Sequence, residues 1–247
     1  MMCRYVPTVA ALGAKVILEV QPALIALVQG LDGVTQVAVK GRPLPAFDVH
    51  CPVMSLPLAF KTRMDTIPAT TPYLKASDEA QARWRKRLHG GGLKVGLAWA
   101  GNPNFGKDHD RSILLKNILP VCSVDGVSFF GIQKDLRDGD REALAATPQI
   151  VHLGGEIEDF RDTAAIMASL DLIISSDTSI VHAAGALGKP VWVLLPSRPD
   201  WRWLLERNDS PWYPTAQLFR QKNDGDWRSV TDEVSAELRK LAAIQSR

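Results

Sequence analysis

The sequence predicts an α/β protein with parallel sheets in two units, and three observations support this. Short apolar segments rich in valine and isoleucine alternate with helical stretches along most of the 247 residues. Several of these segments are apolar along their whole length, which is typical of strands covered by helices on both faces of a parallel sheet. A triglycine at 90–92 follows a basic helical stretch and divides the chain into a smaller and a larger unit.

The smaller unit, residues 1–76, is predicted to be a Rossmann-like domain with strands at 15–20, 34–39 and 47–53. The helix between the first two strands begins near Pro22, because proline is favoured in the first helical turn, and ends at Gly30. The remainder of this unit contains several prolines and no clean period, so it is predicted to be an irregular crossover.

Residues 77–92 are predicted to form a linker helix and a glycine hinge. Ser77 is a favoured N-cap, Asp78 and Glu79 follow in the first turn, and basic residues stand near the end, which suits the helix dipole. The second unit, 93–247, is predicted to be a Rossmann-like domain. Its strands are expected at 93–100, 127–133, 149–153, 171–175, 191–195 and 216–221, and its helices at 113–123, 135–146, 159–169, 178–187, 200–206 and 229–244.

Composition narrows the class of protein. The chain is 46% hydrophobic and 23% charged, an ordinary globular profile, and its net charge of +2 argues against a nucleic-acid binder. No apolar run reaches the roughly 20 residues that a membrane span needs, and the first residues lack a signal-peptide pattern. Cys3, Cys51 and Cys122 are far apart, which favours reduced thiols and a cytoplasmic location. We expect no metal site and no cofactor.

Ligands of an open parallel sheet bind outside the carboxyl ends of its strands. The residues that follow the predicted strands of the second unit are small, polar or charged, as a ligand crevice requires. The side chains expected to bind a ligand there are those of Asn102, Arg111, Gln133, Lys134, Asp177, Thr178 and Ser179.

The stretch SSDTSIVHAAGALGKP, 175–190, joins a strand to a helix of small residues. The unpaired N–H groups and the dipole of a helix N-terminus attract anions, and Thr178 and Ser179 add hydroxyl donors. Asp177 would repel a phosphate, so it either caps the helix or accepts a hydrogen bond from a sugar hydroxyl. The stretch alone supports a phosphate site and a simple helix cap equally.

For several other polar residues, solvation or packing is the alternative to a ligand-binding role. Arg111 stands at the start of a predicted helix, where a cation opposes the dipole, so a ligand-facing role is favoured more for Arg111 than for its neighbours. For Lys107 and Asp108 the favoured interpretation is solvated charge on a loop. Lys134 could hold a phosphate or simply begin the solvent-exposed loop after its strand. His182 is expected to be a packing residue without a catalytic role.

The segment 196–214 is rich in tryptophan. It could stack on a sugar or a base, but packing of the last crossover against the sheet is the favoured interpretation.

His50 could serve as a general base, although a lone histidine is usually structural. The sequence contains no GxGxxG, GxxxxGK[ST], HExxH, GxSxG or CxxC motif, so it does not support a dinucleotide site, a P-loop or the corresponding hydrolase and metal sites.

Several segments together resemble a known family. GLAWAGNP, DRSI, FFGIQK, DTSIVHAAGALGKPVWVLLP and DWRWLLERNDSPWYP resemble the C-terminal part of heptosyltransferase-type glycosyltransferases of family nine. The chain looks still more like the glycosyltransferase-like module that follows tetratricopeptide repeats in many bacterial proteins. With RYVP, LPAFDVHCPVMSLPLAF and TIPATTPYL the resemblance covers nearly the whole chain.

The resemblance implies a GT-B architecture, in which two Rossmann-like domains enclose a nucleotide-sugar cleft. The C-terminal domain would bind the donor, with the diphosphate against Asp177, Thr178 and Ser179 and with Gln133 and Lys134 nearby. The implied reaction is transfer of a sugar from a nucleotide donor to an unknown acceptor without an obligatory metal. Basic side chains and the helix dipole would stabilise the leaving phosphate.

One departure from the family concerns the start of the chain. Family members begin with a strand and a GLGD-type turn, which supplies an aspartate expected to act in catalysis, ahead of the segment RYVPTVAALGAK. The resemblance therefore implies an N-terminally truncated chain with an incomplete first domain, and no catalytic residue is assigned. An unpaired sheet edge would favour self-association. The alternatives to an active transferase or a fragment of one are a non-catalytic nucleotide-sugar-binding module, a GT-B epimerase and an α/β scaffold for protein contacts.

Overall fold

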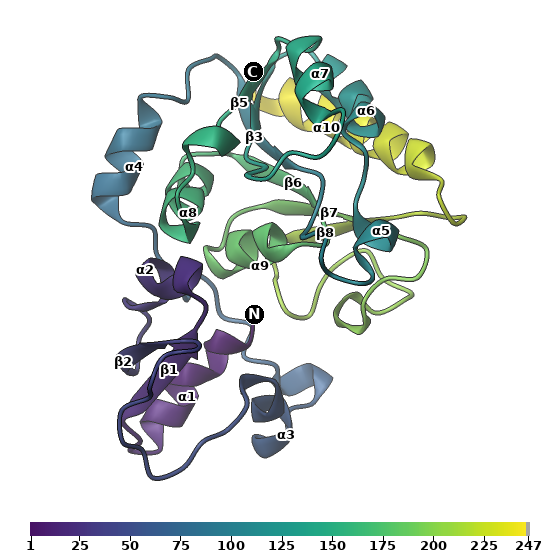
Figure 1. The fold of residues 1–247 in the computed structure, drawn as a ribbon. Coiled ribbons are helices and arrows are strands. Elements are labelled where there is room, and N and C mark those ends of the chain that lie inside the picture. Colours follow the sequence, from purple (N-terminus) through teal and green to yellow (C-terminus); the bar gives the residue numbers. More distant parts are fainter. Residues whose placement is uncertain (246–247) are drawn as a thin grey trace.

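A computed structural model describes residues 1–245 and shows two α/β units (Figure 1). The first unit holds a two-stranded parallel sheet, and the second holds a six-stranded sheet in which every neighbouring pair is parallel. The predicted α/β class with parallel sheets is confirmed. Within residues 1–245, no helix combines the length and the apolar character that crossing a bilayer demands.

All six strands predicted in the second unit are present; four are one or two residues shorter than predicted, β6 is shifted by one residue, and β7 has the predicted bounds. They are β3 (Leu93–Ala98), β4 (Val127–Gly131), β5 (Ile150–His152), β6 (Leu172–Ser176), β7 (Val191–Leu195) and β8 (Ala216–Arg220). Their order across the sheet is β5-β4-β3-β6-β7-β8. Every residue of β6 and β7 is buried, as expected for central strands covered on both faces.

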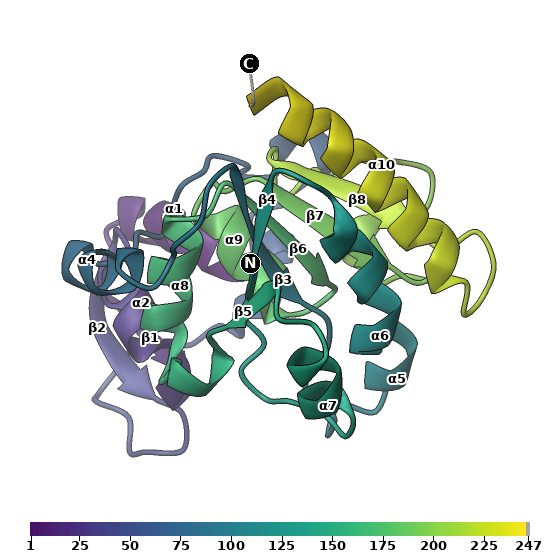
Figure 2. The ribbon, with the colours of Figure 1, turned by 90° about the horizontal axis from the view of Figure 1, so that it is seen from above.

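Helices cover both faces of this sheet (Figure 2). On one face α8 (Phe160–Ala168) and α9 (Ser179–Ala186) pack against Ile173 and Val193. On the other, α6 (Leu115–Ile118) and α10 (Trp227–Gln245) pack against Ile174 and Leu194. Successive residues of a strand point to opposite faces, so consecutive apolar residues serve two separate cores. The sheet is therefore held between two helical layers.

Three predicted helices are shorter than expected, for local reasons. The helix expected at 113–123 becomes a 3-10 turn from Leu119, because Pro120 has no N–H to continue the α-helical pattern. The helix expected at 135–146 is only α7 (Asp140–Ala145), since Gly139 before it has the left-handed φ of 81°. The helix expected at 200–206 is a single 3-10 turn, Trp201–Trp203, that ends where Leu204 takes a φ of 56°.

The first unit contains α1 (Val6–Ala11), β1 (Val16–Val20), α2 (Ile25–Val28), β2 (Val34–Val39) and α3 (Leu56–Ala59). The strands predicted at 15–20 and 34–39 are confirmed, but the strand predicted at 47–53 is wrong. Phe47 and Val49 in that segment are exposed, so its alternating pattern has no core face to bury. Pro45 and Pro52 also remove backbone donors near its two ends.

The predicted linker helix forms α4 (Asp78–Arg85), and Ser77 caps it by accepting a hydrogen bond from the Ala80 N–H at 3.4 Å. This helix packs against α8 rather than lying free. The fully buried carboxylate of Asp162 accepts a hydrogen bond from the Trp84 indole at 3.1 Å and pairs with Arg83. Because both partners come from α4, Asp162 ties this helix to the second unit.

The first five residues also pack against the second unit. Met2 and Tyr5 belong to the same apolar cluster as Trp203 and Trp212, and Arg4 is only 4% exposed. Figure 1 accordingly places the start of the chain between the two units. The contacts of residues 2–5 thus join the first unit to the loops that follow β7.

Gly185 marks a close approach of α9 to the loop before β8. A Cβ atom on Gly185 would lie 2.3 Å from Cδ1 of the buried Tyr213 ring, which cannot move aside freely. We expect Gly185→Ala to lower the free energy of unfolding by about 1–3 kcal/mol, as other overpacked core substitutions do. Gly155→Ala is the control, because a Cβ there meets nothing within 4 Å. Equal urea midpoints for the two variants would contradict this account of the packing.

Candidate functional site

The strand order places a candidate site at the middle of the six-stranded sheet. From β3 the chain proceeds outward to β4 and β5, and from β6 it proceeds outward in the other direction to β7 and β8. The order therefore reverses between β3 and β6, and a ligand crevice is expected at the carboxyl ends of these two strands. Those ends lead into the loop 99–112, with α5 (Asp108–Arg111), and into the turn at Asp177 before α9.

The turn before α9 is capped by Thr178. Its backbone is extended, with φ −133° and ψ −179°, and its Oγ1 accepts a hydrogen bond from the Ile180 N–H at 3.3 Å. The alternative that Asp177 is the N-cap is therefore wrong, because Thr178 already occupies that position. Ser179 is exposed at the first helical position. The buried Ser176 hydroxyl has no hydrogen-bond partner within residues 1–245.

Asp177 lies at the base of this turn and is buried. Burial raises the pKa of its carboxyl group, and the nearby charge of Asp200 raises this pKa further. Arg111 reaches the same turn from α5, and its Nη1 donates a hydrogen bond to the Asp177 carbonyl oxygen at 2.9 Å. The structure thus brings together three predicted site residues, Arg111, Asp177 and Thr178, although 66 residues separate the first two in the sequence.

Asp108 holds Arg111 in place. Its buried carboxylate accepts hydrogen bonds from Arg111 Nε at 3.2 Å and from Ser112 Oγ at 2.9 Å, and it pairs with Arg137. Burial acts to raise the pKa of Asp108, but these three donors outweigh it and leave the pKa below its usual range. The expectation of a solvated Asp108 is therefore wrong, because two arginines converge on it, whereas Lys107 is exposed as expected.

Three other predicted site residues form hydrogen bonds to loops at the ends of strands rather than to the Asp177 turn. Gln133 is buried, and its Oε1 accepts hydrogen bonds from the N–H groups of Trp99 and Ala100 at 3.1 and 3.0 Å, so it shapes the turn after β3. Asn102 is exposed and its Oδ1 accepts from the Asn104 N–H. Lys134 is exposed and donates to the Glu158 carbonyl oxygen. None of the three is hydrogen-bonded to the Asp177 turn.

Two arginines that act on this region were not predicted from the sequence. Arg137 follows β4 and donates to the Gly101 carbonyl oxygen at 3.3 Å, so it braces the loop that carries Arg111. Its position four residues after Gln133, just beyond a predicted strand, was a signal that could have identified it. The second group is Arg202, whose charge acts to lower the pKa of both Asp177 and His182.

His182 lies one turn into α9 and has partners on two sides. Its ring stacks on Trp203 with 5.7 Å between centroids and an interplanar angle of 5°, and its Nδ1 lies 3.2 Å from the Tyr213 hydroxyl. Burial lowers the pKa of His182 well below its usual value, and the charges of Arg202, Arg4 and Arg111 lower it further. The imidazole is therefore neutral at neutral pH, in surroundings where positive charge predominates.

The arrangement can hold an anion. Within residues 1–245, the His, Cys, Asp and Glu side chains form no cluster of three that could hold a metal ion. The positive groups that act on the Asp177 turn are instead the guanidinium groups of Arg111 and Arg202 and the N-terminal end of α9. A ligand there would meet positive charge supplied by the protein itself.

Comparisons with known proteins agree with this fold. No protein-family model matches the chain. Protein FlbA of Caulobacter vibrioides is 27% identical over 209 residues, which cover 80% of this chain and 34% of FlbA. The structure of Escherichia coli ADP-heptose lps heptosyltransferase II is similar, with a TM-score of 0.52 and 20% identity over 73% of this chain and 57% of that one.

A glycosyltransferase of family 9 from Veillonella parvula is similar with a TM-score of 0.51 and 13% identity, over 86% of this chain and 63% of that one. The chain thus spans about a third of the length of FlbA and about three fifths of the two solved structures. At these identities the likeness concerns the fold. The chain therefore has a GT-B-like fold of the heptosyltransferase type, as the resemblance implied.

Proposed function

We propose that this chain binds a nucleotide-sugar in the crevice between β3 and β6 and acts as a glycosyltransferase, or as part of one, in the cytoplasm. The observation that carries the proposal is the meeting of Arg111 with the N-terminal turn of α9 at the topological switch point of the sheet. The fold shared with glycosyltransferases supports the proposed class of reaction.

The diphosphate is proposed to lie against this turn. The first N–H groups of α9 have no partner within the helix, and among residues 1–245 a side chain caps only that of Ile180. These amides and the helix dipole favour an anion. Arg111 adds a full positive charge beside the turn and keeps 24% of its side chain exposed to solvent. The buried hydroxyl of Ser176, the residue before Asp177, has no hydrogen-bond partner among residues 1–245, which supports a polar ligand near this turn.

Asp177 has a different role in this proposal. A carboxylate repels phosphate, so Asp177 accepts a hydrogen bond from a sugar hydroxyl next to the diphosphate. Sugar hydroxyls donate readily to a buried carboxylate, which lacks water as an alternative partner. During transfer, negative charge develops on the leaving diphosphate. In this proposal Arg111, Arg202 and the α9 dipole stabilise that charge, and the transfer proceeds without a metal.

Isothermal titration with ADP, UDP and their glucose conjugates tests the proposal. We expect Arg111→Gln and Thr178→Ala to weaken nucleotide binding about tenfold to a hundredfold, because each removes a donor or orienting group for a charged ligand. Ser77→Ala is the matched control, since it removes the N-cap of α4 and leaves the crevice untouched. Circular dichroism confirms folding of each variant. If the wild-type protein binds none of these nucleotides, the proposal is wrong.

A second candidate function is nucleotide-sugar binding without transfer. Neither the sequence nor the structure assigns a catalytic base to any of residues 1–245, which leaves binding without transfer open. Measured binding of a nucleotide-sugar without release of the nucleoside diphosphate, over a range of acceptors, would favour this module. Absence of nucleotide binding would leave a scaffold for protein contacts.

Self-association is also proposed for the first unit. Within residues 1–245, β1 and β2 pair only with each other, and so both outer edges of this sheet are free of strand partners. Apolar side chains are also exposed on this unit, with Leu12, Val49 and Leu58 each more than three quarters exposed. Light scattering coupled to size exclusion should show a mass that rises with concentration. A constant monomer mass at the highest soluble concentration would refute self-association.

A further inference from the structure

We infer that a pyranose ring binds in the hollow beside the proposed diphosphate site, stacked on the exposed indole of Trp201. The inference rests on the proposed function and names the sugar-binding part of the same crevice. The hollow has a volume of about 440 Å³ and is formed by one loop after β7. It is lined by Pro199, Asp200, Trp201, Leu204, Leu205 and Glu206.

Trp201 differs from the other tryptophans around this loop. Trp192, Trp203 and Trp212 are buried and pack the loop against the sheet, as the sequence analysis favoured, whereas Trp201 is 55% exposed. Leaving so large an apolar ring in water forgoes much of its burial free energy. The ring is nevertheless held in one orientation. The Arg202 guanidinium lies 4.8 Å from its centroid, and Trp212 packs edge-on at 6.1 Å. Trp201 therefore presents a fixed aromatic platform.

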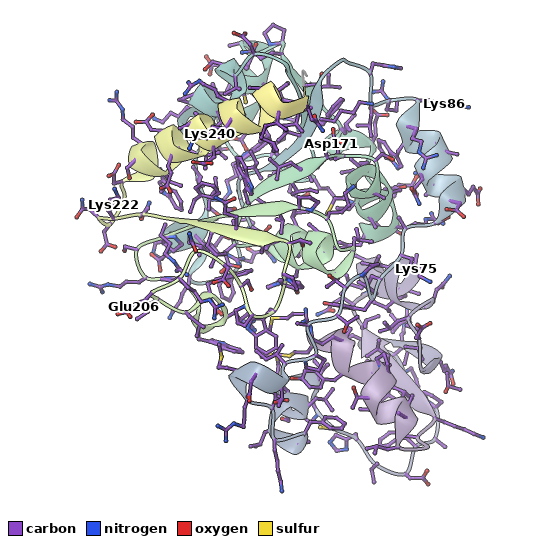
Figure 3. All side chains as sticks on the ribbon, turned by 180° about the vertical axis from the view of Figure 1, so that it is seen from behind. Lys75, Lys86, Asp171, Glu206, Lys222 and Lys240 are labelled. Atoms are coloured by element: carbon purple, nitrogen blue, oxygen red, sulfur yellow. The ribbon has the colours of Figure 1, made fainter. Side chains whose placement is uncertain are left out.

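The two carboxylates of the hollow suit a ring that carries hydroxyl groups. Asp200 Oδ1 accepts from the Arg202 N–H at 3.1 Å and from Arg202 Nη1 at 2.7 Å, whereas Asp200 Oδ2 and both oxygens of Glu206 accept no hydrogen bond from residues 1–245. Figure 3 shows Glu206 projecting from this loop. Free carboxylate oxygens accept hydrogen bonds from neighbouring hydroxyls and repel phosphate. The hollow thus fits the sugar rather than the diphosphate.

The loop is held rigidly, as a binding platform requires. Leu204 adopts φ 56° and ψ −171°, a conformation that only glycine takes without strain. The surroundings maintain it, because Arg220 donates from Nη2 to the Trp203 carbonyl oxygen at 2.6 Å and from Nε to the Arg207 carbonyl oxygen at 3.1 Å. Strain that the fold maintains in this way is a recognised mark of functional loops.

The hollow and the diphosphate site are adjacent. The loop that forms the hollow packs on α9, because the Trp203 ring stacks on the His182 ring with 5.7 Å between centroids. Asp200 lines the hollow, and its charge raises the pKa of Asp177. Arg202 packs on Trp201, and its charge acts to lower the pKa of Asp177. A sugar on Trp201 would therefore lie next to a diphosphate on α9. The ring could belong to the donor or to the acceptor, and the experiment separates these two sources.

The test compares nucleotides with and without a sugar. We expect Trp201→Ala to weaken binding of ADP-glucose or UDP-glucose about fivefold, while ADP and UDP bind within twofold of wild type. Trp201→Phe should restore most of the loss, because it keeps an aromatic face. Leu114→Ala, which removes another exposed apolar side chain, is the control. This result would assign the platform to the donor sugar.

If Trp201→Ala leaves both ligand types unchanged, saturation-transfer NMR with methyl glucoside and methyl mannoside at saturating ADP or UDP tests the acceptor. Signal transfer to the glycoside that disappears in Trp201→Ala supports the inference for the acceptor sugar. No dependence on Trp201 in either arm overturns it, even when the nucleotides bind. Failure of every nucleotide to bind wild type is a separate result, which refutes the proposed function.

Discussion

Replacing Arg4 with alanine is expected to lower the free energy of unfolding by about 3–5 kcal/mol, the largest effect predicted for this protein. Its buried guanidinium donates to the carbonyl oxygens of Pro68 at 2.9 Å and Trp212 at 2.6 Å. It also lies 4.8–5.6 Å from the ring centroids of Tyr73, Trp212 and Tyr213. Removing it leaves buried acceptors without donors and a void between three rings.

Urea denaturation measures this loss of stability, and two further variants test whether it is specific to the buried Arg4 guanidinium. Arg4→Lys keeps the charge but loses the planar fork, so an intermediate loss of stability is expected. Arg42→Ala removes an exposed arginine of the same unit and should change stability by no more than about 0.5 kcal/mol. If Arg4→Ala and Arg42→Ala unfold at the same urea concentration, Arg4 does not join the first unit to the second as described.

Asp108→Asn is expected to have the second largest effect, with a loss of about 2–4 kcal/mol, because it removes the charge that pairs with two partly buried arginines. It should also weaken nucleotide binding, since Arg111 loses the carboxylate that orients it toward the Asp177 turn. Asp110→Asn is the matched control, because Asp110 is exposed and pairs only with His109. Similar urea midpoints for the two variants would show that the Asp108 network contributes little.

The dependence of this effect on pH follows from the lowered pKa of Asp108. A carboxyl group whose folded-state pKa lies below its unfolded value contributes its full stability above the unfolded pKa, about 3.9. That contribution is lost as the pH falls through the lower, folded-state pKa. The difference in unfolding free energy between wild type and Asp108→Asn should therefore be largest near neutral pH and shrink in strong acid. A difference that grew with acidification would contradict the assignment.

Local patterns predicted most of the second unit. Buried strands such as β6 and β7 are continuous apolar runs between turn residues, so their type can be read from a few neighbours. The same reasoning failed at 47–53, where alternation of apolar and polar residues indicated a strand. Alternation specifies a strand only when a core lies on one side, and here Val49 is 86% exposed. Whether a core exists depends on residues elsewhere in the chain.

The candidate site likewise combines features that the local sequence predicts with features that only the tertiary structure produces. The sequence located the turn before α9, but it suggested Asp177 as the cap, whereas Thr178 caps the helix through a contact with Ile180, two positions away. The sequence did not predict the burial of Asp108. Its environment is created by Arg111, close in sequence, and by Arg137, which comes from the far side of β4. Trp201 likewise became distinguishable from its buried neighbours only through its exposure.

By itself, then, the amino-acid order determined the alternation of strands and helices, the parallel character of the main sheet and the capped turn, since all of these depend on contacts within a few residues. Only the tertiary structure brought Arg111 to Asp177, 66 positions away, and Arg4 to Trp212, 208 positions away. Contacts across such separations depend on how the sheet orders its strands and how the two units pack. No local pattern of side chains encodes that geometry.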